Sequence, residues 1–455
     1  MFLDCAQLIA GNGPRLSNGM AVTDVDGDGA FEIVVTGYGT ANLVLKWDGK
    51  QLRDVADPVL ADASRMALAV AAADVDGDGR EEIYVVNTDC GDESDETCDR
   101  LFAGFGNRWM DLLSQSENAA VANRLPGRSV AVLDRAGRGR YGFLLASDGA
   151  PFRLYELGRR GRLVDSAEEA GLDLIGSGRG LVCLPLLSER MDVFAANEGG
   201  PNFLFRNLGD GTFEEIAEER GVTDSRLAGR GVAALDADGD GHMDLVVGHW
   251  DGPQRLYLQR SGGGFVDAAD SEMSMPARVS TVIAADFDND GYEELFFNVC
   301  GGPNRLFAWR HEQWTEIDLG DAVEERSFGT GAVVADIDGD GRLELLIAHG
   351  DVAEQPLSLY RTAPNDNAWL RVQPLTPYGA PARGALVTCF ADGRRQTRAV
   401  CAGSGYLCQM EPVAHFGLGD ARVVERVEVR WPDGMEAIIE SPPLGRVLTV
   451  PHPPE

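Results

Sequence analysis

A short acidic stretch recurs along the chain at a fixed spacing and restricts the possible folds more than any other feature. Each copy carries Asp at positions 1, 3 and 5, Gly at position 6, and an acid at position 9. The first aspartates are Asp24, Asp74, Asp236, Asp286 and Asp336, so the gaps are 50, 162, 50 and 50 residues. A constant period of this size predicts a propeller or a solenoid.

The long gap has room for two altered copies of the same unit. Residues 130–139 keep Asp134 and the closing Gly139, but Ala136 and Arg138 replace the later acids. Residues 181–194 keep only the last acid, Asp192. We therefore expect seven units of about 50 residues, five of them with a full set of acids. The guanidinium of Arg138 is expected where a cation would otherwise lie.

Four strands are predicted in each unit. One apolar strand enters the acidic turn, a second leaves it, a third follows a Gly/Pro/Asn turn, and a fourth carries an apolar residue, a spacer and an acid. The seventh copy of this fourth strand is Phe2-Leu3-Asp4, at the N-terminus. Closure by this strand removes an open sheet edge, which favours a ring over a solenoid. Residues 1–366 are thus predicted to form a seven-bladed β-propeller closed by an N-terminal strand.

The pattern changes after residues 361–368, which are typical of a linker. Four strands are predicted, at residues 369–372, 385–388, 398–400 and 424–431, and Asp-Gly pairs at 392–393 and 433–434 suit hairpin turns. We expect residues 367–455 to form a small β-sandwich-like domain, so that the protein is all-β.

The acidic stretches favour calcium. Alternating carboxylates aim three side chains at one point, and like charges gather only around a cation. Calcium takes six to eight oxygen ligands, whereas magnesium prefers fewer protein ligands. An EF-hand is excluded because position 12 is apolar in every copy. The alternative is a metal-free turn rich in Asp and Gly.

About five calcium ions are expected, one in each complete turn. The residue at position 7 would contribute its backbone carbonyl whatever its side chain. The predicted ligands are Asp24, Asp26, Asp28, Ala30 and Glu32; Asp74, Asp76, Asp78, Arg80 and Glu82; Asp236, Asp238, Asp240, His242 and Asp244; Asp286, Asp288, Asp290, Tyr292 and Glu294; and Asp336, Asp338, Asp340, Arg342 and Glu344.

Charge and composition exclude several classes of partner. The net charge of −33 disfavours nucleic acid and anionic membranes. No apolar run reaches about 18 residues, so no membrane insertion is expected. The first residues lack the features of a signal peptide, which fits either a mature secreted chain or a cytosolic one. Among eight cysteines, Cys90 and Cys98 are a plausible disulfide pair, and two of Cys389, Cys401 and Cys408 could also pair; no zinc spacing occurs.

The acidic turns resemble the FG-GAP (VCBS-type) repeats of integrin α-subunit propellers. Residues 384–407, with the segments His415–Gly419 and Val429–Gly434, resemble the ASPIC/UnbV domain. Together, over essentially the whole chain, they are similar to the cartilage acidic protein family. The resemblance implies a secreted, calcium-binding protein of the matrix or cell surface, with a protein or glycoprotein partner there. No catalytic residue carries over, and we expect a monomer.

Two other functions are compatible with a propeller. A lectin could use Trp47, Trp250 and Trp309 to stack on sugars, although strand and rim packing explains these three rings better. An enzyme could use His249 and His349, which follow the second strand of their units and precede Asp251 and Asp351. Repeat ancestry and hydrogen bonding to a neighbouring blade explain these histidines more simply. We therefore expect an interaction protein rather than an enzyme.

Overall fold

The computed structural model describes residues 1–63, 65–88, 99–106, 108–158, 161–350 and 352–454. Its repeating unit is a meander of four antiparallel strands. In the first unit β2 (Ser17–Thr23) pairs with β3 (Glu32–Gly37), β3 with β4 (Leu43–Trp47), and β4 with β5 (Leu52–Asp54). The nine-residue acidic stretch forms the turn between the first two strands.

The same order continues along the chain. The strands are β6 (Ala67–Ala73), β7 (Glu82–Asn87), β8 (Arg100–Phe105) and β9 (Arg108–Asp111); β10 (Gly127–Leu133), β11 (Gly142–Pro151), β12 (Arg153–Leu157) and β13 (Leu163–Asp165); β14 (Ile175–Leu184), β15 (Asp192–Asn197), β16 (Phe203–Asn207) and β17 (Phe213–Glu215); β18 (Gly229–Leu235), β19 (Asp244–Gly252), β20 (Arg255–Gln259) and β21 (Phe265–Asp267); and β22 (Ala277–Ala285), β23 (Glu294–Val299), β24 (Arg305–Arg310) and β25 (Gln313–Glu316). Among the described residues, the helices are the single turns α1 (Pro58–Ala61), α2 (Ala167–Ala170), α3 (Ala217–Arg220), η1 (Ala6–Leu8) and η3 (Asp321–Val323). Within the described residues, no helix is long and apolar enough to cross a membrane.

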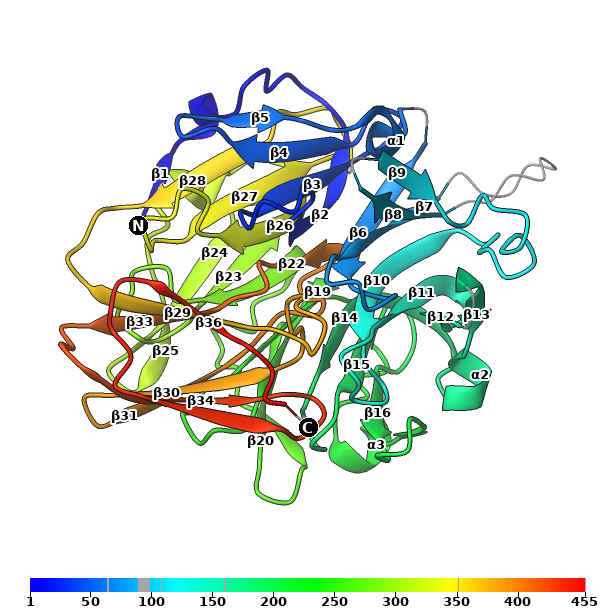
Figure 1. Cartoon of the computed structure of the whole chain (residues 1–455). Coiled ribbons are helices and arrows are strands. Elements are labelled where there is room, and N and C mark those ends of the chain that lie inside the picture. The colour runs from blue at the N-terminus through cyan, green and yellow to red at the C-terminus, as the bar shows by residue number, and fades with distance from the viewer. Residues whose placement is uncertain (64, 89–98, 107, 159–160, 351, 455) are drawn as a thin grey trace.

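The last unit is completed by the start of the chain. It contains β26 (Gly329–Ala335), β27 (Glu344–His349) and β28 (Ser358–Thr362), and its outer strand is β1 (Phe2–Asp4). Phe2 lies opposite Thr362 in the antiparallel pair and is 1% exposed. Its ring meets that of Phe287 edge-on, with 4.9 Å between centroids, so the seam is a packed interface. Figure 1 shows β1 in blue beside β28 in yellow.

The first strands of the units contact one another in a closed cycle, from β2 through β6, β10, β14, β18, β22 and β26 back to β2. Their side chains are mostly buried; every residue of β2, β6 and β26 is. This cycle forms the inner wall of a ring. The prediction of an all-β propeller closed by the N-terminal strand is thereby confirmed.

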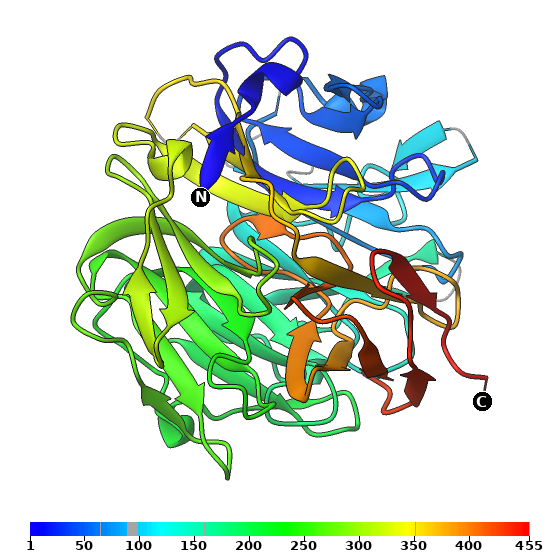
Figure 2. The same cartoon turned by 90° about the vertical axis from the view of Figure 1, so that its left-hand side faces the viewer.

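The C-terminal strands form two small sheets that face each other. One contains β29 (Ala368–Pro374), β33 (Ala414–Gly419) and β36 (Val447–Val450); the other contains β30 (Leu386–Ala391), β31 (Arg394–Ala399), β34 (Val424–Arg430) and β35 (Glu436–Glu440). A separate apolar core that includes Leu370, Val387 and Phe416 lies between them. The sandwich-like prediction is correct. Figures 1 and 2 show these orange and red strands gathered against one side of the ring.

A segment of this domain, residues 402–410, runs inside the ring. Its strand β32 (Cys408–Gln409) pairs in parallel with β2. Val132 of β10 donates its N–H to the Ala402 carbonyl at 2.8 Å, and Val232 of β18 exchanges backbone bonds with Gly405 at 2.6 and 2.9 Å. The other bonds come from Ala72 N to Gln409 Oε1 at 2.8 Å, Thr281 Oγ1 to Tyr406 O at 3.4 Å, and Val334 N to Met410 Sδ at 3.4 Å. Arg179 of β14 donates to the Tyr406 hydroxyl at 3.4 Å, so all seven first strands hold this central segment, which the sequence did not predict.

The fit of the central segment requires glycine on the wall. A Cβ on Gly331 would lie 2.3 Å from the Asn18 carbonyl oxygen and 2.5 Å from Cys408 Sγ. We expect Gly331→Ala to lower the free energy of unfolding by about 1–3 kcal/mol, the usual cost of overpacking. Gly200→Ala is the control because a Cβ there meets nothing within 4 Å. Equal stability of the two variants in urea titrations would contradict a tightly filled channel.

Candidate metal centres

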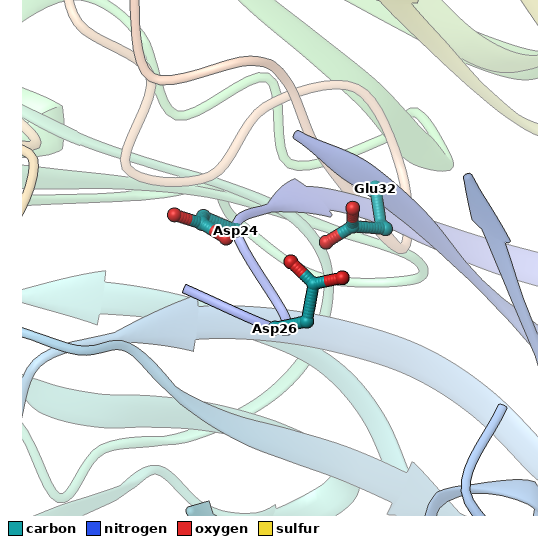
Figure 3. Close-up of side chains that lie close together, drawn as sticks. All are labelled: Asp24, Asp26 and Glu32. Atoms are coloured by element: carbon teal, nitrogen blue, oxygen red, sulfur yellow. The ribbon is translucent and has the colours of Figure 1, made fainter. Parts of the chain in front are cut away.

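Each complete acidic turn is held by its own backbone. In the first, Asp24 accepts hydrogen bonds from the N–H groups of Gly27 and Gly29 at 2.7 and 2.9 Å. Glu32, at the start of β3, accepts one from Val25 at 2.8 Å. Figure 3 shows the carboxylates of Asp26 and Glu32 facing each other, with that of Asp24 across the turn. Ligand oxygens of these three residues all lie within 4.8 Å of one another.

The same arrangement occurs in the other four complete turns. The position-9 acid accepts from the N–H at position 2 in every case, at 2.8–2.9 Å. The remaining groups whose ligand oxygens lie within 4.8 Å are Asp74, Asp76 and Asp78; Asp236, Asp238 and Asp244; Asp286, Asp288 and Asp290; and Asp336, Asp338 and Glu344. The repeat thus builds five similar acidic clusters, as the spacing predicts.

Two residues of each turn have left-handed backbone. Gly at position 6 has φ between 84° and 93°, as expected from the sharp turn. Position 4 is also left-handed, which the sequence analysis missed. It is Gly in four turns and Asn289, at φ 59°, in the fifth; Asn is the side chain that best tolerates this region.

Several carboxylate oxygens in the turns have no protein donor. Asp286 Oδ1, Asp336 Oδ1 and Glu294 Oε1 are buried and find no hydrogen-bond partner within the described part of the chain. An unsatisfied buried carboxylate oxygen is costly unless a cation meets it. Oxygen ligands in this number and arrangement suit calcium. The residues present therefore fit a calcium ion.

Burial strongly affects the proton affinity of these groups. It raises the pKa of Glu82 to about 9, of Glu344 to about 8, and of Asp244 to about 7, and the neighbouring aspartates add to each rise. A bound divalent cation favours the ionised form and would reverse this effect.

The raised pKa values of the buried acids predict an unusual pH dependence of the calcium-free protein. The folded pKa values lie above those of unfolded Asp and Glu, so folded chains bind more protons and the free energy of unfolding falls as pH rises. With excess chelator, we expect the melting temperature to increase as pH decreases from about 9 to about 7. The calcium-loaded protein should not show this increase in differential scanning calorimetry. Parallel slopes for both forms would contradict the assignment.

Basic side chains approach four of the five turns from the third strand of the same unit. Lys46 Nζ lies 2.6 Å from Asp26, 2.7 Å from Asp28 and 2.9 Å from Glu32. Arg361 pairs with Asp338 and Glu344 from the equivalent register position. Arg260, directly after β20, and Arg310, at the end of β24, lie two residues beyond the position equivalent to Lys46. Arg260 contacts Asp238 at 3.2 Å, and Arg310 contacts Asp288 at 3.0 Å. These side chains were not predicted, and they balance part of the negative charge.

The residues at position 7 are oriented by their own N–H groups. Each donates to the position-5 carboxylate at 2.8–2.9 Å: Ala30 to Asp28, Arg80 to Asp78, His242 to Asp240, Tyr292 to Asp290, and Arg342 to Asp340. The side chains at position 7 do not share one role. The Arg80 guanidinium, for example, donates a hydrogen bond to the Gly106 carbonyl at 3.0 Å. Ligation through their carbonyls stays a prediction.

The two altered turns are satisfied without a cation. Asp192 accepts from the N–H groups of Leu186, Leu187, Ser188 and Asn207 and from the Ser188 hydroxyl, all at 2.7–3.0 Å. In the other turn, Asp134 accepts from Gly139 N at 2.6 Å. The Arg138 side chain is exposed, and its place at the position of a cation stays a prediction. Burial raises the pKa of Asp134, and the positive charge of Arg190 nearby opposes this rise.

The C-terminal domain docks onto the face that carries the turns. Arg371 contacts Asp336 at 3.0 Å, and Gly417 N donates to Asp286 Oδ2 at 3.0 Å. His415 Nε2 lies 2.6 Å from Asn289 Oδ1, so this histidine has a structural role at the contact between the two domains. The second domain thus covers these two turns and also reaches the Asp74–Glu82 turn, where Arg383 pairs with Glu81 at 2.6 Å; no sequence pattern indicated these contacts.

The other candidate residues have structural contacts. His249 is fully buried, and desolvation lowers its pKa to about 4; its Nε2 lies 3.6 Å from Asp224. His349 is also buried, 3.0 Å from Ser358 Oγ. Asp251 ion-pairs with Arg278 at 3.0 Å, whereas Asp351 lies outside the described residues.

The tryptophans considered for sugar stacking contact other side chains. Trp250 lies under the Arg230 guanidinium at 3.6 Å, and Trp309 packs edge-on against Trp314 with 5.7 Å between centroids. Trp47 has the Arg361 guanidinium 5.5 Å from its ring centroid. These contacts match the packing interpretation of the three rings.

Among the described cysteines, Cys5, Cys183, Cys389, Cys401 and Cys408 form no disulfide, so the pairing considered within the C-terminal cluster is wrong. Cys90 and Cys98 lie outside the described residues, so their pairing stays a prediction. Burial raises the pKa of the Cys183 and Cys408 thiols, which makes them unreactive at neutral pH.

Comparison with known families supports the organisation into repeats and a second domain. Residues 376–455 match the family described as ASPIC and UnbV, and residues 24–85, 189–247 and 236–297 match the FG-GAP-like repeat. Among solved structures, the BP39L lectin from Burkholderia pseudomallei aligns with a TM-score of 0.52 at 13% identity, covering 77% of this chain and 98% of the lectin. BBS1N, solved in complex with ARL6DN, aligns with a TM-score of 0.50 at 11% identity, covering 80% of this chain and 97% of BBS1N. Such likeness shows the fold alone.

Curated relatives align over nearly the whole chain. Cartilage acidic protein 1 of Homo sapiens is 46% identical over 97% of this chain and 73% of its own length. The protein of that name from Mus musculus is 45% identical over 97% of this chain and 75% of its own length. The one from Xenopus tropicalis is 44% identical over 93% of this chain and 71% of its own length. The chain belongs to the cartilage acidic protein family.

Proposed function

We propose that this protein is an extracellular interaction module in which five calcium ions fix the acidic turns. The proposal rests on three buried carboxylate oxygens that find no hydrogen-bond donor among the described residues, within a repeated geometry: Asp286 Oδ1, Asp336 Oδ1 and Glu294 Oε1. Calcium at these turns rigidifies the junction of the first two strands of a blade. Two of the turns also support the second domain, so the ions hold the propeller, residues 1–366, against the C-terminal domain, residues 367–455.

The partner is a protein or glycoprotein of the matrix or cell surface. The relatives are named as acidic proteins of cartilage, and the fold presents broad loop surfaces suited to binding. The candidate histidines are buried in packing, which supports an interaction role over catalysis. Recovery of the protein from culture medium, with its native N-terminus sequenced, tests the extracellular location. A product retained inside the cell would oppose it.

Calcium content after dialysis tests the metal assignment directly. We expect elemental analysis to find about five calcium ions per chain, and Asp76→Asn to lose about one of them, since a ligand carboxylate is removed. Asp210→Asn is the matched control: Asp210 lies in a Gly-Asp-Gly hairpin and accepts bonds only from its neighbour Thr212 within the described residues. A calcium-free protein, or equal loss in both variants, would refute the proposal.

A further inference from the structure

The ring opens into a cavity of about 520 Å³ at the end opposite to the acidic turns. The turns follow the C-terminal ends of the first strands, whereas the cavity is lined by residues at or near their beginnings. Tyr406 and Leu407 of the central segment also line it, at its base. Every unit contributes one residue from this level of the wall: Asn18, Leu68, Arg128, Arg179, Arg230, Ser280 and Thr330.

Three consecutive units place arginine at this level, and we call Arg128, Arg179 and Arg230 the arginine mouth. The other four units place Asn, Leu, Ser and Thr there and pack into the same closed ring. Packing of the blades therefore does not require a guanidinium at this position. The concentration of positive charge also contrasts with a chain whose net charge is −33.

Two of the three guanidinium groups are held in place. Arg179 is only 9% exposed, and its Nη1 donates to the Tyr406 hydroxyl at 3.4 Å. Arg230 lies over the Trp250 ring at 3.6 Å, a cation–π contact. Rigid donors lose little entropy on binding, so these two arginines are pre-organised.

Local acids neutralise the arginine mouth only in part. Glu198 pairs with both Arg179 and Arg230, the latter at 3.1 Å, and Asp148 lies 3.5 Å from Arg128. Among the described residues, three guanidinium groups thus face two carboxylates, which leaves one positive charge for a ligand. The Nε atoms of all three arginines are buried without a hydrogen-bond partner in this portion of the chain.

We propose that the arginine mouth binds a small ligand that carries an oxyanion together with hydroxyl groups. Planar guanidinium groups pair with carboxylate, sulfate and phosphate through parallel N–H bonds. The wall adds the hydroxyls of Tyr38, Thr88 and Ser280, which suit the hydroxyls of a sugar acid or sugar ester. The volume falls within the usual range of about 300–1,000 Å³ for small-molecule sites.

Isothermal titration calorimetry of the calcium-loaded full chain tests this proposal. The probes are D-glucuronate, inorganic sulfate, inorganic phosphate and neutral D-glucose, in a low-salt chloride buffer. We expect saturable binding of one oxyanion per chain and none of glucose. Glucuronate binding more tightly than both inorganic ions assigns a sugar acid, and the reverse order assigns a sulfate or phosphate group. The absence of heat for all three anions up to about 10 mM would overturn the proposal.

Two substitutions and one control locate the binding. Arg128→Gln and Arg230→Gln should each weaken binding of the bound anion about tenfold or more, since a charge-assisted hydrogen bond is lost. Arg278→Gln should not, because Arg278 is exposed, pairs with Asp251 and lies outside the cavity lining. Arg128→Lys should keep part of the affinity. Equal affinity in all variants, or equal binding of glucose, would overturn the proposal.

Discussion

Chelation of calcium with excess EGTA is expected to lower the melting temperature by on the order of 10 °C. An ion that binds only the folded state at about 100 times its dissociation constant contributes about 2.7 kcal/mol. Five such ions contribute about 13 kcal/mol, which is comparable to the whole stability of many domains. The loss is large because the carboxylates of each turn then repel one another, with only Lys46 and a few arginines to offset them.

Differential scanning calorimetry with and without EGTA measures this effect. Added calcium in excess should restore the original transition, and magnesium should not, because its smaller shell suits these turns poorly. An unchanged transition in a sample shown by elemental analysis to lack calcium would contradict the structural role of the ions.

Replacement of Arg383 by Met should be the most destabilising single substitution, at about 3–5 kcal/mol. Arg383 is fully buried between the two domains, and its Nε lies 2.6 Å from Glu81 Oε1. Its other nitrogens donate to the carbonyls of Val22 and Cys401 at 3.0 and 2.9 Å. Without the guanidinium, the Glu81 charge stays buried and unpaired, which is costly.

A double-mutant cycle in urea separates charge pairing from packing. Arg383→Met combined with Glu81→Gln should recover part of the loss because no unpaired charge remains. Arg53→Met provides the control: Arg53 pairs with Asp48 at the surface, and such pairs contribute about 0–1 kcal/mol. Additive losses in the double variant would contradict a coupled pair.

Local patterns in the sequence predicted the ring and the clusters well. The ligands of one turn lie within nine residues, so spacing alone places Asp24, Asp26 and Glu32 together. The pattern of Phe2-Leu3-Asp4 matched the outer strands of other units, which identified the closing strand. Each inference needed only a short segment and its repetition.

Contacts between distant segments could not be predicted in the same way. Arg383 and Glu81 are separated by 302 positions, and Gln409 bonds to Ala72 across 337. No period links such pairs, and the central segment forms them with several blades at once. The run Gly403-Ser404-Gly405 was a usable signal, because glycine permits close approach of neighbouring backbones. The side chain of Lys46 was missed because its register on β4 became clear only from strand pairing.

The seam of the ring has a consequence for synthesis on the ribosome. Proteins are made from the N-terminus, so strand β1 emerges before the strands of the other six blades, whereas its partner β28 (Ser358–Thr362) emerges after them. Until β28 is made, β1 remains an unpaired edge. The segment at 402–410 that fills the ring emerges later still. The nascent chain therefore holds an open arc of blades, which closes only after β28 and the central segment have been made.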